Sequence, residues 1–268
     1  MLHLLNNERM WLLEPDAYAR LSRLPLLAAI PDTDNGGGAA PTIQGGLATV
    51  PIRGTLLRAA TEGERYTLRA YGVDYTETAP LARTLTSLET NPDISVVLLD
   101  IDSPGGTVNG TPELANAVRS LSRRKHVYAY TAGLCCSAAY WVASQCDGIY
   151  AAPSSRVGSI GVLLPVTDST EAYSRSGLKV ELFSAGRYKG AGMGGTSLSD
   201  EQRALLQEQV NTTWAEFKEA VNARRAVAEE DMEGQTFTGR QGASRGLVDA
   251  CADSIEAVQE KLLRRHGC

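Results

Sequence analysis

The stretch IDSPGG at residues 101–106 ends an apolar run in a turn, and GLCCSAAYW at residues 133–141 places a serine where the next apolar run gives way to a helix. Pro104 fixes one backbone dihedral of the turn, and Gly105 and Gly106 can adopt conformations that are closed to other residues. The amides of such a turn can converge on an oxyanion. The same residues would also suit an ordinary tight turn before a helix.

Ser137 is the serine of the second stretch, and it follows an apolar strand at residues 128–132 and a turn at Gly133. The N-terminus of the next helix adds partial positive charge near the serine oxygen, although serine is also a common helix N-cap. The other residues at 135–139 are small and leave room for a substrate backbone. A serine beside an oxyanion turn indicates acyl transfer, provided that a base takes the serine proton.

Strands and helices alternate around these two stretches, which predicts an α/β fold with a parallel sheet and right-handed crossovers. A long helix that begins at Ser199 is expected to form an arm outside the sheet. The expected strands are 48–57, 94–101, 126–131, 148–151, 178–183 and 247–248, and the expected helices are 77–90, 111–124, 138–145, 170–176, 199–225 and 254–265.

Residues 1–46 are expected to be a leader and a flexible linker, and residues 47–268 a single folded domain. Within the leader, Pro15 opens a short amphipathic helical turn. The stretch PDTDNGGGAAPTIQGG at residues 31–46 is rich in glycine, proline, aspartate and asparagine and has no periodicity, which is typical of a linker.

Composition argues against several kinds of partner. The chain of 268 residues carries a formal net charge of -5, which provides no basic field for nucleic acid or acidic lipid. The five cysteines match neither the spacing of a zinc site nor a secreted disulfide framework, and no apolar run approaches the ~20 residues of a membrane span. We therefore expect a cytoplasmic protein without a metal, a nucleic-acid partner or a membrane segment.

Lys189 is the best candidate for the base. Of the histidines, His3 and His266 lie near the ends of the chain and His126 opens a strand, so none is a plausible member of a Ser-His-Asp triad. A lysine can act as a base when burial lowers its pKa, although Lys189 could equally be a solvated loop lysine. Ser159, within VGSIGV, could orient such a lysine or simply mark a bend in a strand.

In their order and spacing, IDSPGG, Ser137, the GSIGV stretch and Lys189 resemble the Ser-Lys peptidases of the signal peptide peptidase A family. The stretch EGQTFTGRQGASRGLVDA at residues 233–250 is similar to the closing segment of that family. The resemblance therefore covers residues 47–250 and is more specific than any one of its motifs.

This resemblance implies Ser137 as the nucleophile, Lys189 as the general base and Ser159 as the hydroxyl that positions the lysine. It also implies the fold of caseinolytic proteases and crotonases, which is built from ββα units and usually assembles into homo-oligomeric rings. We expect an endopeptidase that uses no metal or cofactor. In some members the serine and the lysine of one site come from neighbouring subunits. The implied oxyanion hole consists of backbone amides at Gly105, Gly106 and Ala138.

Membrane-bound members of that family carry an N-terminal anchor and often Ser-Gly-Gly-Tyr at the nucleophile. Here no anchor is expected, and residues 137–141 read SAAYW. This variant, together with WLLEPDAY at residues 11–18, is similar to bacteriophage head maturation proteases of the minor capsid protein C type. It implies an endopeptidase that cleaves capsid or scaffold proteins and is associated with a virion or procapsid.

Three alternatives remain open at the level of sequence. The chain could degrade membrane-released peptides, as signal peptide peptidases do. It could be a crotonase-like acyl-CoA enzyme, for which Glu113 is the one nearby carboxylate to nominate. It could also be a non-catalytic assembly subunit that keeps the fold, although the presence of Ser137, Ser159 and Lys189 together argues against this.

Overall fold

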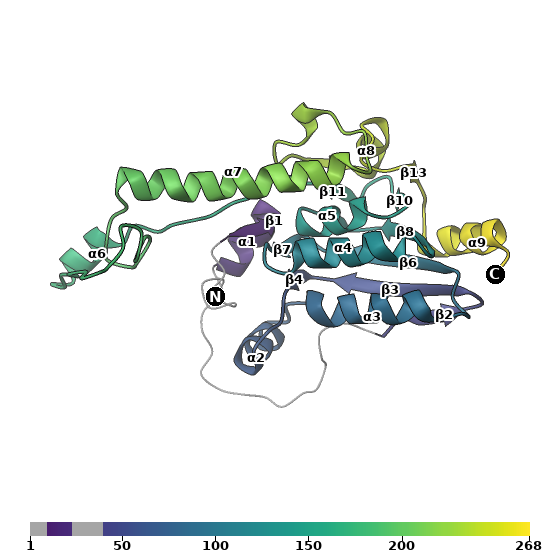
Figure 1. Cartoon of the computed structure of the whole chain (residues 1–268), viewed down its shortest axis with the longest axis horizontal. Coiled ribbons are helices and arrows are strands. Elements are labelled where there is room, and N and C mark those ends of the chain that lie inside the picture. Colours follow the sequence, from purple (N-terminus) through teal and green to yellow (C-terminus); the bar gives the residue numbers. More distant parts are fainter. Residues whose placement is uncertain (1–9, 23–39) are drawn as a thin grey trace.

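The computed structural model describes residues 10–22 and 40–268. A central sheet has the strand order β13-β10-β8-β6-β3-β2, and every pair in it is parallel except β2 with β3 (Figure 1). The predicted α/β fold with a parallel sheet is therefore confirmed. The strands of this sheet are β13 (Ala250–Cys251), β10 (Gly148–Ala151), β8 (His126–Thr131), β6 (Val96–Asp102), β3 (Leu47–Arg53) and β2 (Thr42–Gln44).

Short strands follow β3, β6 and β8 and leave the central sheet, so that the chain repeats ββα units as the resemblance implied. The expected single strand 48–57 is split at Gly54, whose φ is 63° and where a Cβ would lie 1.9 Å from the Asp74 carbonyl oxygen. The short strands form two further sheets, ordered β1-β7-β4-β5 and β12-β11-β9. They are β1 (Trp11–Leu13), β4 (Thr55–Leu57), β5 (Tyr75–Glu77), β7 (Gly105–Thr107), β9 (Leu134–Cys136), β11 (Arg156–Gly158) and β12 (Thr236–Thr238).

Helices cover both faces of the central sheet. Side chains alternate between the faces of a strand, so Val97 and Leu99 of β6 join the core cluster under α3 (Thr78–Thr90), α4 (Thr111–Leu121) and α5 (Ala138–Ser144). Val96 and Leu98 point the other way and pack with α9 (Ile255–His266). Burial on both faces explains why β6 reads as an unbroken apolar run.

A long helix, α7 (Asp200–Asn222), runs along one edge of the molecule and carries α6 (Thr170–Arg175) at its far end (Figure 1). It starts with a capping box, because the Ser199 hydroxyl accepts a hydrogen bond from the Gln202 amide and Gln202 Oε1 accepts one from the Ser199 amide. Only Phe217 and Val221, near its end, are buried. The predicted arm is therefore attached to the core by its last turns.

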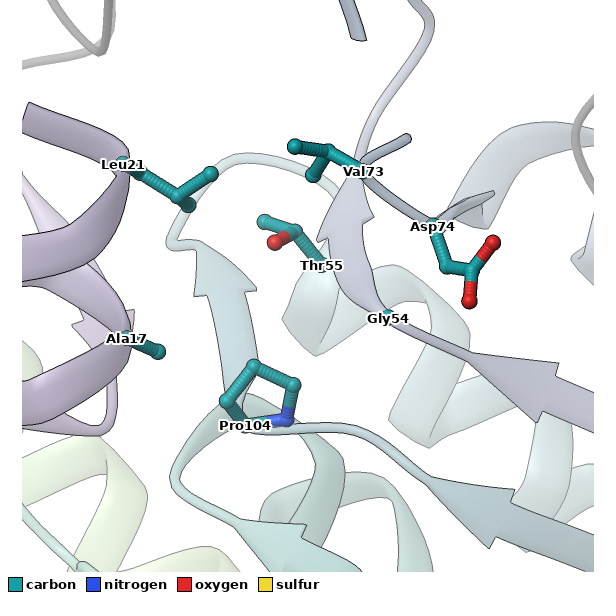
Figure 2. A pocket seen from close by; sticks show the side chains of 7 residues that line it. All are labelled: Ala17, Leu21, Gly54, Thr55, Val73, Asp74 and Pro104. Carbon is teal, nitrogen blue, oxygen red and sulfur yellow. The ribbon is translucent and has the colours of Figure 1, made fainter. Parts of the chain in front are cut away.

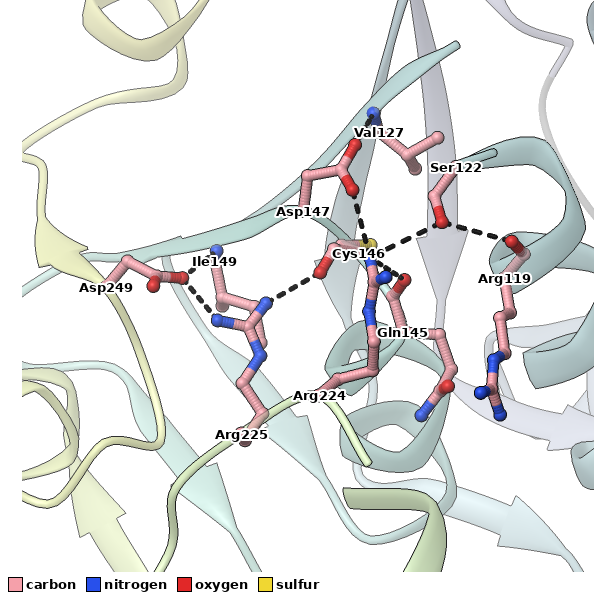
Figure 3. Close-up of polar contacts among 10 residues, drawn as sticks. All are labelled: Arg119, Ser122, Val127, Gln145, Cys146, Asp147, Ile149, Arg224, Arg225 and Asp249. Carbon is pink, nitrogen blue, oxygen red and sulfur yellow. Dashed lines mark hydrogen bonds and ion pairs between the residues drawn. The ribbon is translucent and has the colours of Figure 1, made fainter. Parts of the chain in front are cut away.

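Two arginines just after α7 hold this attachment (Figure 3). Arg224 Nη2 lies 2.9 Å from Asp147 Oδ1, and Arg225 Nη1 lies 2.5 Å from Asp249 Oδ2. Arg225 also donates to the Cys146 carbonyl oxygen at 2.8 Å. The Arg225 side chain is almost fully buried, but Asp249 is 49% exposed, so solvent still partly screens this ion pair.

Some sequence expectations differ from the structure. Residues 178–183 form no strand: Leu178, Leu182 and Phe183 are exposed, and only Val180 is half-buried. The strand expected at 247–248 is found slightly later, as β13. Apart from β4, which lies within the expected strand 48–57, the three-residue strands and the helix α2 (Glu62–Ala70) were not expected, since segments this short carry little periodicity. A short helix η2 (Glu229–Asp231) and α8 (Gly239–Ser244) complete the described elements.

The region expected to be leader and linker is only partly described. Residues 1–9 and 23–39, which hold most of the expected linker, lie outside the described residues. The described part contains β1, α1 (Pro15–Ser22) and β2. Among the described helices, none combines the length and apolar character that crossing a lipid bilayer requires.

Candidate active site

Ser137 occupies the junction between β9 and α5. Its φ of 52° and ψ of -121° lie in a region that residues other than glycine rarely adopt, and such strain concentrates at functional sites. The side chain is 1% exposed, and its Oγ has no hydrogen-bond partner among the described residues. A buried hydroxyl without a partner loses hydrogen-bonding free energy, so it calls for a functional explanation.

Ser159 lies beside Ser137. Strands β9 and β11 run in parallel with Gly158 opposite Cys136, and the Ser137 amide donates to the Gly158 carbonyl oxygen at 2.7 Å. Ser159 has the same positive φ of 52° and is also buried. Its amide donates to the Gln235 carbonyl oxygen at 2.7 Å, which ties the two serines to the segment before β12.

The glycine turn reaches the same place from β6. A Cβ added to Gly105, whose φ is 105°, would lie 2.9 Å from Ser137 Cβ and 3.1 Å from the Ala138 amide nitrogen. Ser103 fixes the turn, because its hydroxyl accepts from the Gly105 amide at 3.2 Å and its carbonyl accepts from the Cys136 amide at 3.1 Å. The structure therefore brings together Ser137, Ser159 and the expected oxyanion turn at Gly105, Gly106 and Ala138.

Lys189 is not brought to this place within one chain. Its side chain is exposed, and it belongs to the loop between α6 and α7. Figure 1 shows α6 and the start of α7 at the far end of the arm from α5. Two hydrogen bonds join the beginning and the end of the segment 168–197, which contains Lys189. The Asp168 carboxylate accepts from Ser197 Oγ at 2.8 Å, and the Ser169 hydroxyl accepts from the Gly195 amide at 2.8 Å.

The segment of the arm that contains Lys189 also carries several exposed apolar side chains. Phe183 is 91% exposed and Leu178 is 58% exposed. When exposed apolar side chains form a contiguous patch, they mark sites of association. Others of this group, which we call the arm patch, are Val166, Tyr173, Leu182, Tyr188 and Met193.

Cys136 immediately precedes Ser137 but is a poor competing nucleophile. Burial is the largest cause that raises the pKa of the Cys136 thiol to about 12, and the neighbouring Glu14 raises it further. Burial likewise raises the pKa of Cys146 to about 12 and that of Cys135 well above its ordinary value. Because the thiolate is the reactive form, these cysteines are inert at neutral pH.

A pocket of about 300 Å³ lies next to the oxyanion turn, not over Ser137. Figure 2 shows Ala17 and Leu21 of α1 on one side of it and Thr55, Val73 and Pro104 on the other. The residues that line it include no pair of a nucleophile and a neighbouring base. We therefore interpret this pocket as a packing gap between α1 and the body.

Sequence reasoning did not expect β1 at this site. Its pairing with β7 brings Trp11, Leu12 and Leu13 against the glycine turn, and all three side chains are buried. A triplet bounded by Pro15 is too short for a strand signal. The available clue was the run of three bulky apolar residues, which is costly to leave in solvent.

Known proteins match the chain in sequence. The model of peptidase family S49 matches residues 119–264, which is more than half of the chain. Capsid assembly protease C of Escherichia phage lambda is 27% identical over 81% of this chain and 48% of its own length. The head-tail preconnector protein of Enterobacteria phage P21 is 28% identical over 87% of this chain and 47% of its own length. The chain thus spans about half the length of these relatives.

Among solved structures, an enoyl-CoA hydratase/isomerase family member superposes with a TM-score of 0.46 at 17% identity, over 86% of this chain and 76% of that one. The family match includes Ser137, Ser159 and Lys189, the three side chains singled out above. By this match, the chain belongs to peptidase family S49.

Proposed function

We propose that the chain is a serine endopeptidase in which Ser137 is the nucleophile and Lys189 of a second copy is the general base. The observation that carries this proposal is the state of Ser137, which is buried, without a hydrogen-bond partner among the described residues, and held at a strained φ beside Gly105. A hydroxyl in this state is positioned to attack a bound carbonyl once a base removes its proton.

The chemistry follows from these groups. A neutral Lys189 takes the proton of Ser137 Oγ, and the oxygen attacks the carbonyl carbon of a bound peptide. Backbone amides at Gly106 and Ala138 donate to the oxyanion that forms. The intermediate expels the amine, which receives the proton from the lysine, and leaves an acyl-enzyme on Ser137. Water, deprotonated by the same lysine, then releases the acid, while the Ser159 hydroxyl holds the lysine amine in place.

The position of Lys189 supports a base supplied by a neighbouring copy. In one chain its side chain is exposed in the loop between α6 and α7, whereas Ser137 is buried in the body. Docking of the arm patch onto another copy would cover Phe183 and Leu178 and bury the lysine at the same time. Assembly into a homo-oligomer would then be a condition of activity.

Capsid or scaffold proteins of a phage head are the substrates that we propose, with the procapsid as the place of action. This rests on similarity to the capsid assembly protease of phage lambda and the head-tail preconnector protein of phage P21. The acyl-CoA alternative gains nothing from the structure, because Glu113 is exposed on the first turn of α4.

Complementation between two variants tests the proposal. Ser137→Ala and Lys189→Ala should each lower cleavage of a coexpressed capsid protein by about 10²–10⁴-fold or more, as loss of the nucleophile or general base does. Because the dyad crosses between copies, mixing the two variants should restore part of the activity. Lys179→Ala, another exposed lysine on the arm, is the matched control and should cleave normally.

Cleavage is read by mass spectrometry of the new termini. Full activity in either variant alone would refute the assignment of that residue. Two inactive variants that stay inactive when mixed would place the base within the same chain as Ser137.

A further inference from the structure

One segment of the chain lies in a peptide-like position beside Ser137. Strand β1 pairs antiparallel with β7, with Leu12 opposite Gly106. On its other edge, Trp11 exchanges both backbone hydrogen bonds with Leu163, at N···O distances of 2.9 and 3.0 Å. Extended peptides bind to sheet edges through main-chain hydrogen bonds of the same kind.

The register of β1 follows from the hydrogen bonds at its two ends. The Glu14 amide donates to the Pro104 carbonyl oxygen at 2.8 Å, and the Val108 amide donates to the Met10 carbonyl oxygen at 3.4 Å. Opposed residues of an antiparallel pair alternate between hydrogen-bonded and non-hydrogen-bonded positions. The pair between these two ends, Leu12 with Gly106, is therefore hydrogen-bonded, and the Leu12 carbonyl faces the Gly106 amide.

The Leu12 carbonyl oxygen also lies close to the nucleophile. A Cβ on Gly105 would be 2.1 Å from this oxygen, 2.9 Å from Ser137 Cβ and 3.1 Å from the Ala138 amide nitrogen. One small space thus holds the Leu12 carbonyl oxygen, the serine and the second proposed oxyanion amide. This is the place that the carbonyl of a scissile peptide bond must take.

We propose that residues 10–14 occupy the peptide-binding channel of Ser137 in the register of a substrate, with Leu12 in place of the residue whose carbonyl is attacked. The inference rests on the proposed role of Ser137. A protein substrate must displace β1 before it can be cleaved. Extended peptides with a branched apolar residue at the attacked carbonyl are then the preferred substrates.

The side chains of β1 define what the channel accepts. Leu12 is fully buried in the main core cluster, which also contains Ala138 and Ile160 on the side of Ser137. Trp11 and Leu13 point to the opposite side, into a separate cluster with α1 and α2. Since strand side chains alternate, a bound substrate would send every second residue into each of these two clusters.

The contact between α1 and the body would allow β1 and α1 to leave the channel together. Glu14 couples the strand to the helix, because its carboxylate accepts from the Ala17 amide at 3.1 Å. The pocket of about 300 Å³ leaves a gap where α1 meets Thr55 and Pro104 (Figure 2). Gaps forfeit packing contacts, so β1 and α1 can leave together at a lower cost than a fully packed element.

A reversible lock provides the test. Trp11 and Thr107 form a non-hydrogen-bonded pair, whose Cα atoms lie roughly 4.5 Å apart, within the range of a disulfide. In the full-length double variant Trp11→Cys, Thr107→Cys, oxidation should slow labelling of Ser137 by a leucyl-peptide fluorophosphonate about tenfold or more relative to the reduced protein. Each single cysteine variant is a control and should show no dependence on redox state.

Equal labelling of the oxidised and reduced double variant would overturn the inference and leave the role of Ser137 intact. Absence of labelling in the reduced, folded and assembled double variant, whose β1 is free to leave, would instead refute the nucleophile on which the inference rests. The wild-type chain gives a second measurement that needs no variant. Covalent labelling of Ser137 should accelerate hydrogen exchange at the amides of β1, and unchanged exchange would again contradict occupation of the channel.

Discussion

Ser137 and Lys189 lie in two regions of the chain that differ in how far one copy completes them. The body around Ser137 is closed, since β7, β9, β11 and α5 meet there and the serine is 1% exposed. The arm around Lys189 is open, and Phe183 on it is 91% exposed. In the body, sequence and packing within one chain determine the position of each group. On the arm, Phe183 and Leu178 remain exposed among the described residues, and this difference is why we propose that a second copy supplies the lysine.

The largest effect should come from the arm patch. Phe183→Asp places a charge where we expect contact with another copy, and desolvating that charge would oppose docking. Assembly should be lost, and cleavage should fall about 10²–10⁴-fold because the lysine is no longer delivered to Ser137. Size-exclusion chromatography with light scattering and the cleavage assay measure both.

The control is Ile43→Asp, because Ile43 is also an exposed apolar residue but lies on the edge strand β2 of the body. This variant should assemble and cleave normally. If Phe183→Asp also remained assembled and active, the arm would not be the contact between copies, and the comparison of body and arm would lose its basis.

A smaller effect should come from close packing in the body. Gly105→Ala must hold alanine at a φ of 105° and bring a Cβ within 2.1 Å of the Leu12 carbonyl oxygen. The positive φ alone costs about 1–3 kcal/mol of unfolding free energy, and the contact adds to this. Urea unfolding measures the loss. Gly63→Ala is the matched control, since its Cβ would meet nothing within 4 Å and alanine favours the helix α2.

The sequence predicts the body of the molecule better than it predicts the arm. The strand expected at 148–151 and the helix expected from residue 138 were found there, because long apolar periods and small residues report burial within the chain. The three-residue strands could not be predicted from period alone. The strand β1 depends on pairing with β7, which is far along the chain, so no local pattern encodes it.

For the site, the motifs around Gly105, Ser137 and Ser159 lie at strand ends that the parallel sheet brings to one edge, so their proximity could be expected. The position of Lys189 could not, because the length and direction of α7 carry its loop away from that edge. The strand predicted at 178–183 was wrong for a related reason. Apolar residues there predicted burial within the chain, but they are exposed on the arm.

Within the body, thiol reactivity should distinguish exposed from buried cysteines without any mutation. At pH 7.5 an aromatic disulfide reagent should modify Cys251 rapidly, because it is exposed. Cys136 and Cys146 should react only after unfolding, since burial keeps their pKa at about 12 and leaves almost no thiolate at that pH. Peptide mapping with and without urea reads this out. Fast modification of Cys136 in the folded chain would show that the body opens around Ser137 more than its packing suggests.

The smallest expected effect concerns pH and the far side of the body, where the rings of His126 and His266 stack at 4.0 Å. Burial, followed by the charge of His126, lowers the pKa of His266 below its usual value. The unfolded chain therefore binds a proton at a higher pH than the folded chain does, so stability is complete above about pH 6.5 and declines as the pH falls below it. In His266→Gln this contribution disappears, so the stability difference between wild type and variant should shrink from pH 7.5 to pH 5.5. Urea unfolding at both pH values measures it, and a difference that grows at low pH would contradict the lowered pKa.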